Sequence, residues 1–118
     1  MKTVAEWKAA LRTAMKDALR TRNAPASAVL REALAAIDNA EAPDISIAPA
    51  PAGGGIAGST AGLGSGEVSR LLLSPEEVDA LIQREIQERR DAVALYLQLG
   101  RHEEARVLQT QVEVLLAL

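Results

Sequence analysis

The chain has 118 residues, enough for one small domain, and a formal net charge of −3, which argues against a bulk nucleic-acid binder. The absence of cysteine excludes disulfides and metal sites built from thiolates. Hydrophobic residues make up 48% of the chain but aromatic residues only 2%, so we expect a core of Leu, Ile, Val and Ala, which favours packed helices over a sheet.

The first predicted helix begins after Thr3. Thr3 and Glu6 have the spacing of a capping box, in which each side chain accepts a hydrogen bond from a backbone N–H at the helix start. Apolar residues then recur at helical spacing as far as Ala18, and the helix is expected to end near Arg22. The apolar set is Val4, Trp7, Leu11, Met15 and Ala18.

A second helix follows at once. Asn23 suits its N-cap, and Pro25 is tolerated in the first turn because the missing N–H has no partner there. So short a connection predicts that residues 1–41 form a helical hairpin. The apolar face of the second helix is Val29, Leu30, Ala33, Leu34 and Ile37.

Residues 42–73 interrupt the helical pattern. Seven of the eight glycines lie between Gly53 and Gly66, and three prolines precede them. Such a composition loses much entropy on ordering and has little to bury, so we expect a flexible Gly/Pro/Ala-rich insert, with Leu71–Leu73 pinning its end to the core. The run 62–66 has no preceding strand and no following lysine, so it is not a phosphate-binding loop of the Walker type.

The third predicted helix has the strongest start signal. Ser74-Pro75-Glu76-Glu77 supplies an N-cap, a proline at the first helical position and acids near the positive helix end. Gly100 suits the left-handed residue that follows a helix C-terminus. The apolar face of this helix is Val78, Ile82, Ile86, Val93 and Tyr96.

A fourth helix completes a second hairpin over residues 74–118. Its inward positions are Ala105, Leu108, Val112 and Leu115. The expected fold class is therefore all-α, an antiparallel bundle of two helical hairpins with about four main helices, in a single domain over residues 1–118.

Arg89 falls in the middle of the apolar face of the third helix. An unpaired buried charge costs several kcal/mol or more, so this side chain needs an acidic partner. We predict a structural ion pair between Arg89 and Glu113 of the fourth helix, with Glu32 or Glu41 of the second helix as alternatives. The other interpretation is an anion site, in which the planar guanidinium holds a phosphate.

Four basic residues recur every four positions in the first helix: Lys8, Arg12, Lys16 and Arg20. This basic ridge lies beside and opposite the apolar face, where it could follow a phosphate backbone and neutralise ~3–4 charges with marked salt sensitivity. No aromatic residue is interleaved for base stacking, so readout of a base sequence is not expected. The alternative is an ordinary solvated helix face. Residues 1–41 carry a net charge of +2 and residues 74–118 a net charge of −4.

The residues give little support to catalysis. His102 is the single histidine and falls in a predicted turn. The acidic pairs Glu76/Glu77 and Glu103/Glu104 sit at helix starts, where the helix dipole explains them. We therefore predict no catalytic residue, no cofactor and no metal. Without a secretory signal or a run of about 18 apolar residues, the expected location is cytoplasmic, with no membrane partner.

Two blocks of the chain resemble the GatB/YqeY family, small proteins related to the tail of a tRNA-dependent amidotransferase subunit. The first block is Ala14-Met15-Lys16, Arg31 and residues 34–41 (LAAIDNAE), and the second is residues 74–77, residues 86–91, Gly100-Arg101 and Glu113. The family usually has a short charged connection in place of the Gly-rich insert. It also continues into a second helical domain, the part similar to the amidotransferase tail, whereas this sequence ends at Leu118.

This resemblance implies a non-catalytic, YqeY-like N-terminal helical domain that acts around tRNA or the glutamine-dependent tRNA amidotransferase, a carbon–nitrogen ligase. The expected RNA or anion contacts are Lys8, Arg12, Lys16, Arg20, Arg90 and Arg101. The alternative is a protein–protein interaction or self-association module with no nucleic-acid role. Sequence leaves the actual partner and the oligomeric state open.

Overall fold

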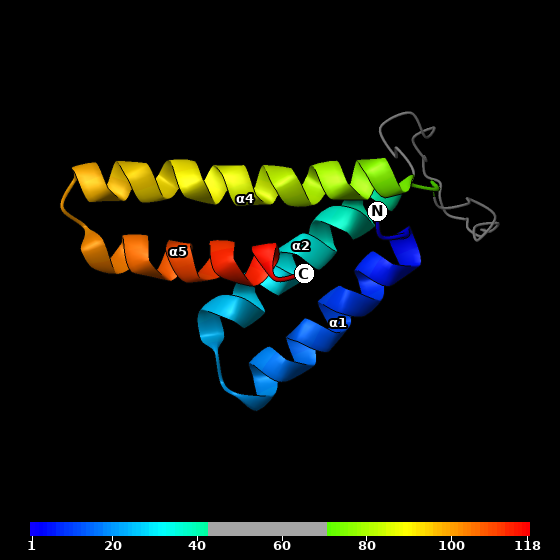
Figure 1. Cartoon of the computed structure of the whole chain (residues 1–118), viewed down its shortest axis with the longest axis horizontal. Helices are drawn as coiled ribbons and strands as arrows, with labels where there is room; N and C mark the ends of the chain where they lie inside the picture. The colour runs from blue at the N-terminus through cyan, green and yellow to red at the C-terminus, as the bar shows by residue number, and fades with distance from the viewer. Residues whose placement is uncertain (43–70) are drawn as a thin grey trace, which may run out of the picture. The chain divides into compact units, whose positions relative to one another are not determined.

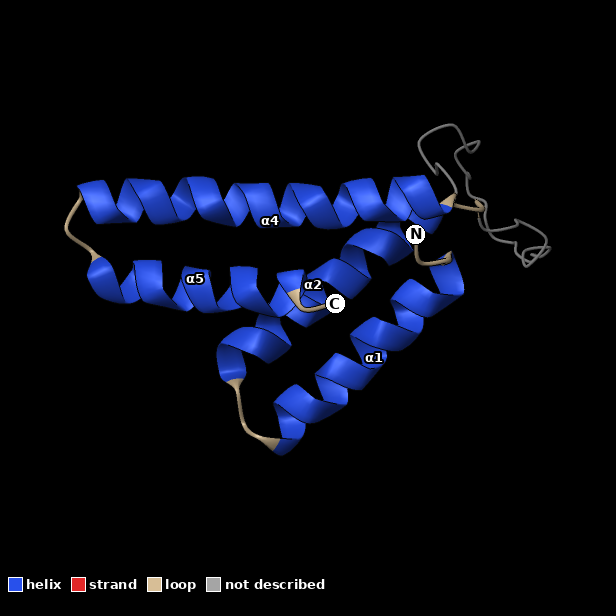
Figure 2. Ribbon diagram, viewed as in Figure 1, coloured by secondary structure: helices blue, strands red, loops and turns tan. Residues whose placement is uncertain are grey.

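The computed structural model describes residues 1–42 and 71–118, and these residues are all-α (Figures 1 and 2). They form four helices and no strand, which confirms the expected fold class. The helices are α1 (Val4–Arg20), α2 (Ala24–Glu41), α4 (Pro75–Gln98) and α5 (His102–Leu116).

The predicted insert at 42–73, with its glycine-rich run at 62–66, lies largely outside the described residues. Its two ends are described, and the Leu71 N–H donates to the Glu41 carbonyl oxygen at 2.7 Å. The chain divides into two units, Met1–Asp38 with Leu73–Leu118, and Asn39–Leu72. The first unit carries the core and the surfaces described below.

Local side-chain chemistry sets the helix starts, as predicted. The Thr3 hydroxyl accepts from the Glu6 N–H at 3.1 Å, and the Thr3 N–H donates to the Glu6 carboxylate at 2.8 Å. This backbone hydrogen bond from Thr3 holds the pKa of the Glu6 carboxyl below its ordinary value. Ser74 and Glu77 form the same reciprocal pair, at 3.1 and 2.8 Å, with Pro75 in the first turn. The capping boxes of α1 and α4 are thus confirmed.

α2 begins with the predicted asparagine cap. The Asn23 side-chain oxygen accepts from the Ala26 N–H at 3.2 Å. α1 ends at Arg20, slightly before the expected end near Arg22. The reason is a tight hydrogen-bonded turn, in which the Asn23 N–H reaches back to the Ala18 carbonyl oxygen at 2.8 Å.

α4 ends in the same kind of turn. The Arg101 N–H donates to the Tyr96 carbonyl oxygen at 2.8 Å, and the Gly100 N–H donates to that of Leu97 at 3.1 Å. Gly100 has φ +74°, the left-handed conformation predicted for it. In the turn after α1 the equivalent residue is Arg22, with φ 57°, where the backbone carries a side chain that this region disfavours.

The core of the first unit lies where the four helices meet, and the predicted inward residues of the first hairpin fill it. Leu73 packs against this core, whereas Leu72 is 95% exposed, so only the last of the three leucines that close the insert is anchored there. The buried set is Trp7, Leu11, Ala18, Ala26, Val29, Leu30, Ala33, Ile37, Val78, Ile82, Ile86, Val112 and Leu115.

The α4–α5 hairpin is only partly covered. α4 has 24 residues, which makes it about 36 Å long. Figure 1 shows α4 and α5 running side by side toward their shared turn, away from α1. Val93, Tyr96 and Leu108 were expected inward but are only half-buried, because they lie in this outer part of the hairpin.

Candidate functional site

Arg89 lies where α2, α4 and α5 meet, and its side chain is only 11% exposed. One of its terminal nitrogens donates to the Glu85 carboxylate at 2.8 Å and to the Glu85 carbonyl oxygen at 3.1 Å. The other terminal nitrogen pairs with the Glu32 carboxylate of α2. The Glu85 side chain is 18% exposed and that of Glu32 is 60% exposed. Glu85 is therefore the inner partner, and Glu32 closes the pair from the solvent side.

Gln111 of α5 completes this arrangement. It is buried, its side-chain oxygen accepts from Arg89 Nε at 3.3 Å, and its side-chain nitrogen donates to the Pro25 carbonyl oxygen at 3.0 Å. One amide thus links α4, α5 and the first turn of α2. We call the set Glu32, Glu85, Arg89, Gln111 and Pro25 the Arg89 network.

The network corrects one prediction and disfavours another. Arg89 was expected to pair with Glu113, but its carboxylate partners are Glu32 and Glu85. Glu113 is exposed, because it lies about 200° around α5 from Gln111. The anion-site interpretation is also weakened, because the guanidinium already faces two carboxylates that would repel a phosphate. Arg89 thus forms an ion pair within the bundle, as predicted; Glu32 is one of the alternative partners expected from the sequence, whereas Glu85 was not expected.

Gln111 is the residue that sequence reasoning missed. A signal for it existed, because Gln111 stands three residues after Leu108 and four before Leu115, on the apolar side of α5. A polar residue at such a position requires a partner inside the bundle.

The basic ridge lies on α1, and its two central members are exposed. Arg12 and Lys16 are exposed, and neither forms a hydrogen bond or ion pair with another described residue. Each four-residue step advances about 40° around a helix, so the ridge winds from the edge of the core to the opposite side. Lys8 at its start is accordingly half-buried. Arg20 at its end is exposed and pairs with Asp17.

Arg90 and Arg101 belong to the hairpin instead. Arg90 is exposed on α4. Arg101 stands at the turn, where it pairs with Glu104 at 2.7 Å and lies over the Tyr96 ring at 5.5 Å from the ring centre. The pKa of the Glu104 carboxyl lies below its ordinary value. The main cause is a hydrogen bond from the Glu104 backbone N–H, and the next is the hydrogen bond from the Arg101 side chain. α4 borders α1 near Ile86. The α4–α5 turn lies about 20 Å farther along α4, so Arg101 is not part of the basic ridge.

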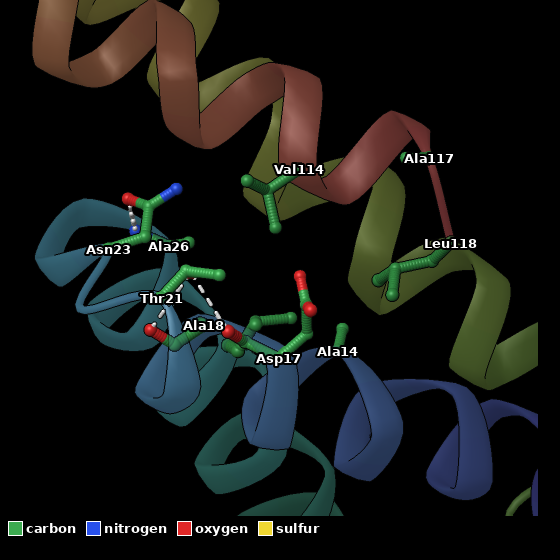
Figure 3. Close-up of a pocket in the computed structure, with 10 residues that line it drawn as sticks. Ala14, Asp17, Ala18, Thr21, Asn23, Ala26, Val114, Ala117 and Leu118 are labelled. Carbon is green, nitrogen blue, oxygen red and sulfur yellow. Dashed lines mark hydrogen bonds between the residues drawn. The ribbon is translucent and has the colours of Figure 1, made fainter.

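One small pocket opens between the α1–α2 turn and the end of α5. In Figure 3 Asp17 of α1 and Thr21 of the α1–α2 turn lie across it from Val114 of α5, with Asn23 at the left of the view. Its volume is about 220 Å³. Asp17 is the one ionisable side chain among its lining residues, so the pocket lacks the paired groups that acid–base catalysis uses.

A second pocket, of about 330 Å³, lies beside Trp7 between α1 and α4. The Lys2 ammonium sits over the Trp7 ring at 5.0 Å. The Trp7 indole N–H is buried and has no hydrogen-bond partner among the described residues. Because that nitrogen is closed off from solvent, it cannot serve as a donor to a ligand in the adjoining pocket.

Neither a metal-binding cluster nor a membrane-spanning helix is found in the described part of the chain. Residues 1–42 and 71–118 contain no group of three or more His, Cys, Asp or Glu placed to hold a metal ion. His102 is exposed at the first position of α5. Within the same residues, no helix has the length and apolar character needed to cross a bilayer.

Comparisons with protein-family models, curated proteins and solved structures find no match to this chain. The likeness to the GatB/YqeY family therefore remains a prediction from the residues quoted above.

Proposed function

We propose that this chain is a non-catalytic helical module that contacts the phosphate backbone of RNA through the basic ridge of α1. The observation that carries the proposal is the exposure of Arg12 and Lys16 without an acidic partner among the described residues. Cations in this state are available to neutralise phosphates, and the counterions that the RNA then releases supply much of the binding free energy.

The length of the ridge sets the size of the contact. Four residues of helix rise about 6 Å, so the ridge extends about 18 Å from Lys8 to Arg20. Its twist limits simultaneous contact to its central part, around Arg12 and Lys16. No aromatic side chain lies between them in α1, so binding is expected to depend on salt and to be insensitive to base sequence.

The likeness to the GatB/YqeY family makes tRNA the first RNA to test. On this proposal the chain works in the cytoplasm beside tRNA or the glutamine-dependent tRNA amidotransferase, and the ligase chemistry belongs to that enzyme. Within this chain, Arg12 and Lys16 would hold the RNA, and Arg89 would keep the helices in register.

The test compares two double variants with the same change in net charge. Arg12→Ala with Lys16→Ala should lower the affinity for tRNA in low salt about tenfold or more, and should reduce the slope of log K against log salt by about 1.5. The control, Arg84→Ala with Arg106→Ala, removes two exposed cations from α4 and α5 and should retain most of the binding. Replacing all four ridge residues by Ala should abolish retention, with the helical circular dichroism unchanged.

Two results would contradict the proposal. One is a wild-type chain that does not bind tRNA at about 50 mM salt, where phosphate contacts are strong. The other is an equal loss of affinity in both double variants, which would mean that binding follows the overall charge and not the ridge.

A second candidate function has its own supporting observation. Leu95 and Leu99, one helical turn apart, are 52% and 60% exposed at the outer end of the α4–α5 hairpin. Exposed apolar residues gathered on one element indicate a protein-interaction surface, which was the alternative expected from the sequence.

A further inference from the structure

The face of the hairpin that carries the Arg89 network continues beyond it toward the turn. On α4, Ala92 and Tyr96 follow Arg89 at three and seven positions. On α5, Leu108 and Glu104 precede Gln111 at the same spacings. Residues three, four and seven positions apart lie on one side of a helix. A shallow pocket of about 360 Å³ confirms that this side is uncovered, and its lining is Ala92, Tyr96, Glu104, Val107 and Leu108.

The uncovered side is apolar over both helices. Leu95 is 52% exposed, Leu99 60% and Val107 44%, whereas Tyr96 and Leu108 are half-buried. Burying a leucine or valine side chain is worth about 1.5–3 kcal/mol, so this surface gains when something covers it. We define the distal face as Ala92, Leu95, Tyr96, Leu99, Val107 and Leu108.

The position of the first turn of α2 explains why the distal face is uncovered. α2 begins at Ala24, and the carbonyl oxygen of Pro25 in its first turn meets Gln111. Arg22 and Asn23, immediately before α2, form the turn that connects it to α1. α2 therefore covers the hairpin only as far as the Arg89 network. Beyond it, α4 and α5 form a single layer, whereas helical domains bury their apolar faces between two layers.

The charges around the distal face indicate what covers it. From residue 90 to residue 109 the hairpin carries three basic and three acidic side chains, for no net charge. Nucleic acid and anionic lipid surfaces both require a basic excess. On the rim, Arg101 and Glu104 present one charge of each sign side by side. A rim with one charge of each sign is compatible with a two-fold axis, because Arg101 of one copy can face Glu104 of the other without like-charge repulsion.

We infer that the distal face binds the distal face of a second copy of this chain about a two-fold axis. The two hairpins then pack as two layers of two helices each, with Tyr96 and Val107 near the centre of the interface. The face measures roughly 10 by 20 Å in projection, which is small beside the ~800 Å² per partner of stable complexes. The dimer is therefore weak and reversible, with a dissociation constant in the micromolar range or above.

Sedimentation equilibrium tests this inference. The average mass of the wild-type chain should rise from 12.5 kDa toward twice that value as its concentration increases from about 10 µM to about 1 mM. High salt should not weaken the association, because burial of apolar surface drives it. Leu99→Glu with Val107→Glu should keep the chain monomeric. Leu19→Glu is a control for introducing a carboxylate at an exposed leucine, since Leu19 is 58% exposed on α1, outside the distal face.

Cross-linking provides a second measurement that does not depend on a charged substitution. The natural chain has no cysteine, so single variants Leu95→Cys, Leu99→Cys and Val107→Cys report on one site each. At least one of them should form a disulfide-linked dimer under mild oxidation much faster than Leu19→Cys. A wild-type chain that stays monomeric at the highest concentration would overturn the inference and assign the distal face to a different protein. Equal behaviour of the Leu19 and distal-face variants would also overturn it.

Discussion

At the scale of single residues, the two helix C-termini make a natural comparison. The same hydrogen-bonded turn follows α1 and α4, and in each the residue after the cap has positive φ. Gly100 takes this conformation without strain, and a Cβ added there would meet no atom within 4 Å. Arg22 takes it at the expense of about 1–2 kcal/mol, because its Cβ crowds the carbonyl oxygen.

Arg22→Gly is therefore expected to stabilise the chain. The relief of left-handed strain exceeds the roughly 0.5–1 kcal/mol that glycine loses through its freer unfolded state, so the free energy of unfolding should rise by about 0.5–1 kcal/mol. Urea denaturation followed by circular dichroism measures the change. The control is the opposite exchange at the equivalent position after α4, Gly100→Ala, which should lower stability by about 1 kcal/mol. A loss of stability in Arg22→Gly would show that its side chain makes a contact that outweighs the strain.

At the scale of elements, the Arg89 network decides how the hairpins register. It supplies polar side-chain contacts from α4 to α2 and α5, whereas the surrounding core contacts are apolar and less directional. Removing one partner leaves the others buried and unsatisfied, so the cost depends on how deeply each side chain lies.

The depth of each side chain predicts a rank order of stability loss for four alanine variants. Arg89→Ala should lower the free energy of unfolding by about 2 kcal/mol. This is less than the roughly 3–5 kcal/mol lost when a fully buried pair is broken, because Glu32 reaches the pair from the solvent side. Glu85→Ala should cost about 1 kcal/mol, since its side chain is 18% exposed. Glu32→Ala should cost about 0.5 kcal/mol or less, as an exposed ion pair does. Glu113→Ala should lie within about 0.5 kcal/mol of the wild type. A larger loss in Glu113→Ala than in Glu85→Ala would contradict the assigned pairing.

The sequence predicts the features of these elements that are local. Thr3, Ser74 and Gly100 act through backbone groups a few positions away, so their roles follow from spacing alone. The direction of Arg89 toward the interior also follows from helical periodicity. Its partner does not, because periodicity says nothing about which turn of α2 or α5 lies opposite.

The half-buried outer residues illustrate the same limit. The helical pattern places Val93 and Tyr96 on the apolar face of α4, and they do lie there. Their exposure depends on where α2 ends in space, which is set by the turn at Arg22 and by the crossing of the helices. The basic ridge was likewise located by its spacing, whereas the pairing of Arg20 with Asp17 and of Arg101 with Glu104 needed the structure.

At the scale of the molecule, the two candidate surfaces differ in chemistry and in place. The ridge on α1 is basic and solvated, whereas the distal face is apolar and carries no net charge around it. Neither surface uses a residue of the other. Loss of one should leave the other intact, and this separation allows each proposal to fail alone.

If both proposals hold, self-association should strengthen RNA binding through avidity. A dimer carries two ridges, and a second ridge engages the same RNA at an effective concentration far above that of free protein, provided the RNA reaches both. Leu99→Glu with Val107→Glu should therefore weaken the apparent affinity for full-length tRNA at protein concentrations above the dimer dissociation constant. Its affinity for an RNA too short to reach a second ridge should match that of the wild type.

Fluorescence titration with the two RNAs measures this difference, and the variant with Arg12→Ala and Lys16→Ala supplies the reciprocal control. That ridge variant should lose affinity for both RNAs while sedimenting as a dimer like the wild type. Equal weakening of the short and the long RNA by the distal-face variant would mean that the distal face contacts RNA directly, in conflict with its lack of net charge. No effect on either RNA would mean that the two ridges of a dimer cannot reach one tRNA, because avidity vanishes when geometry forbids simultaneous contact.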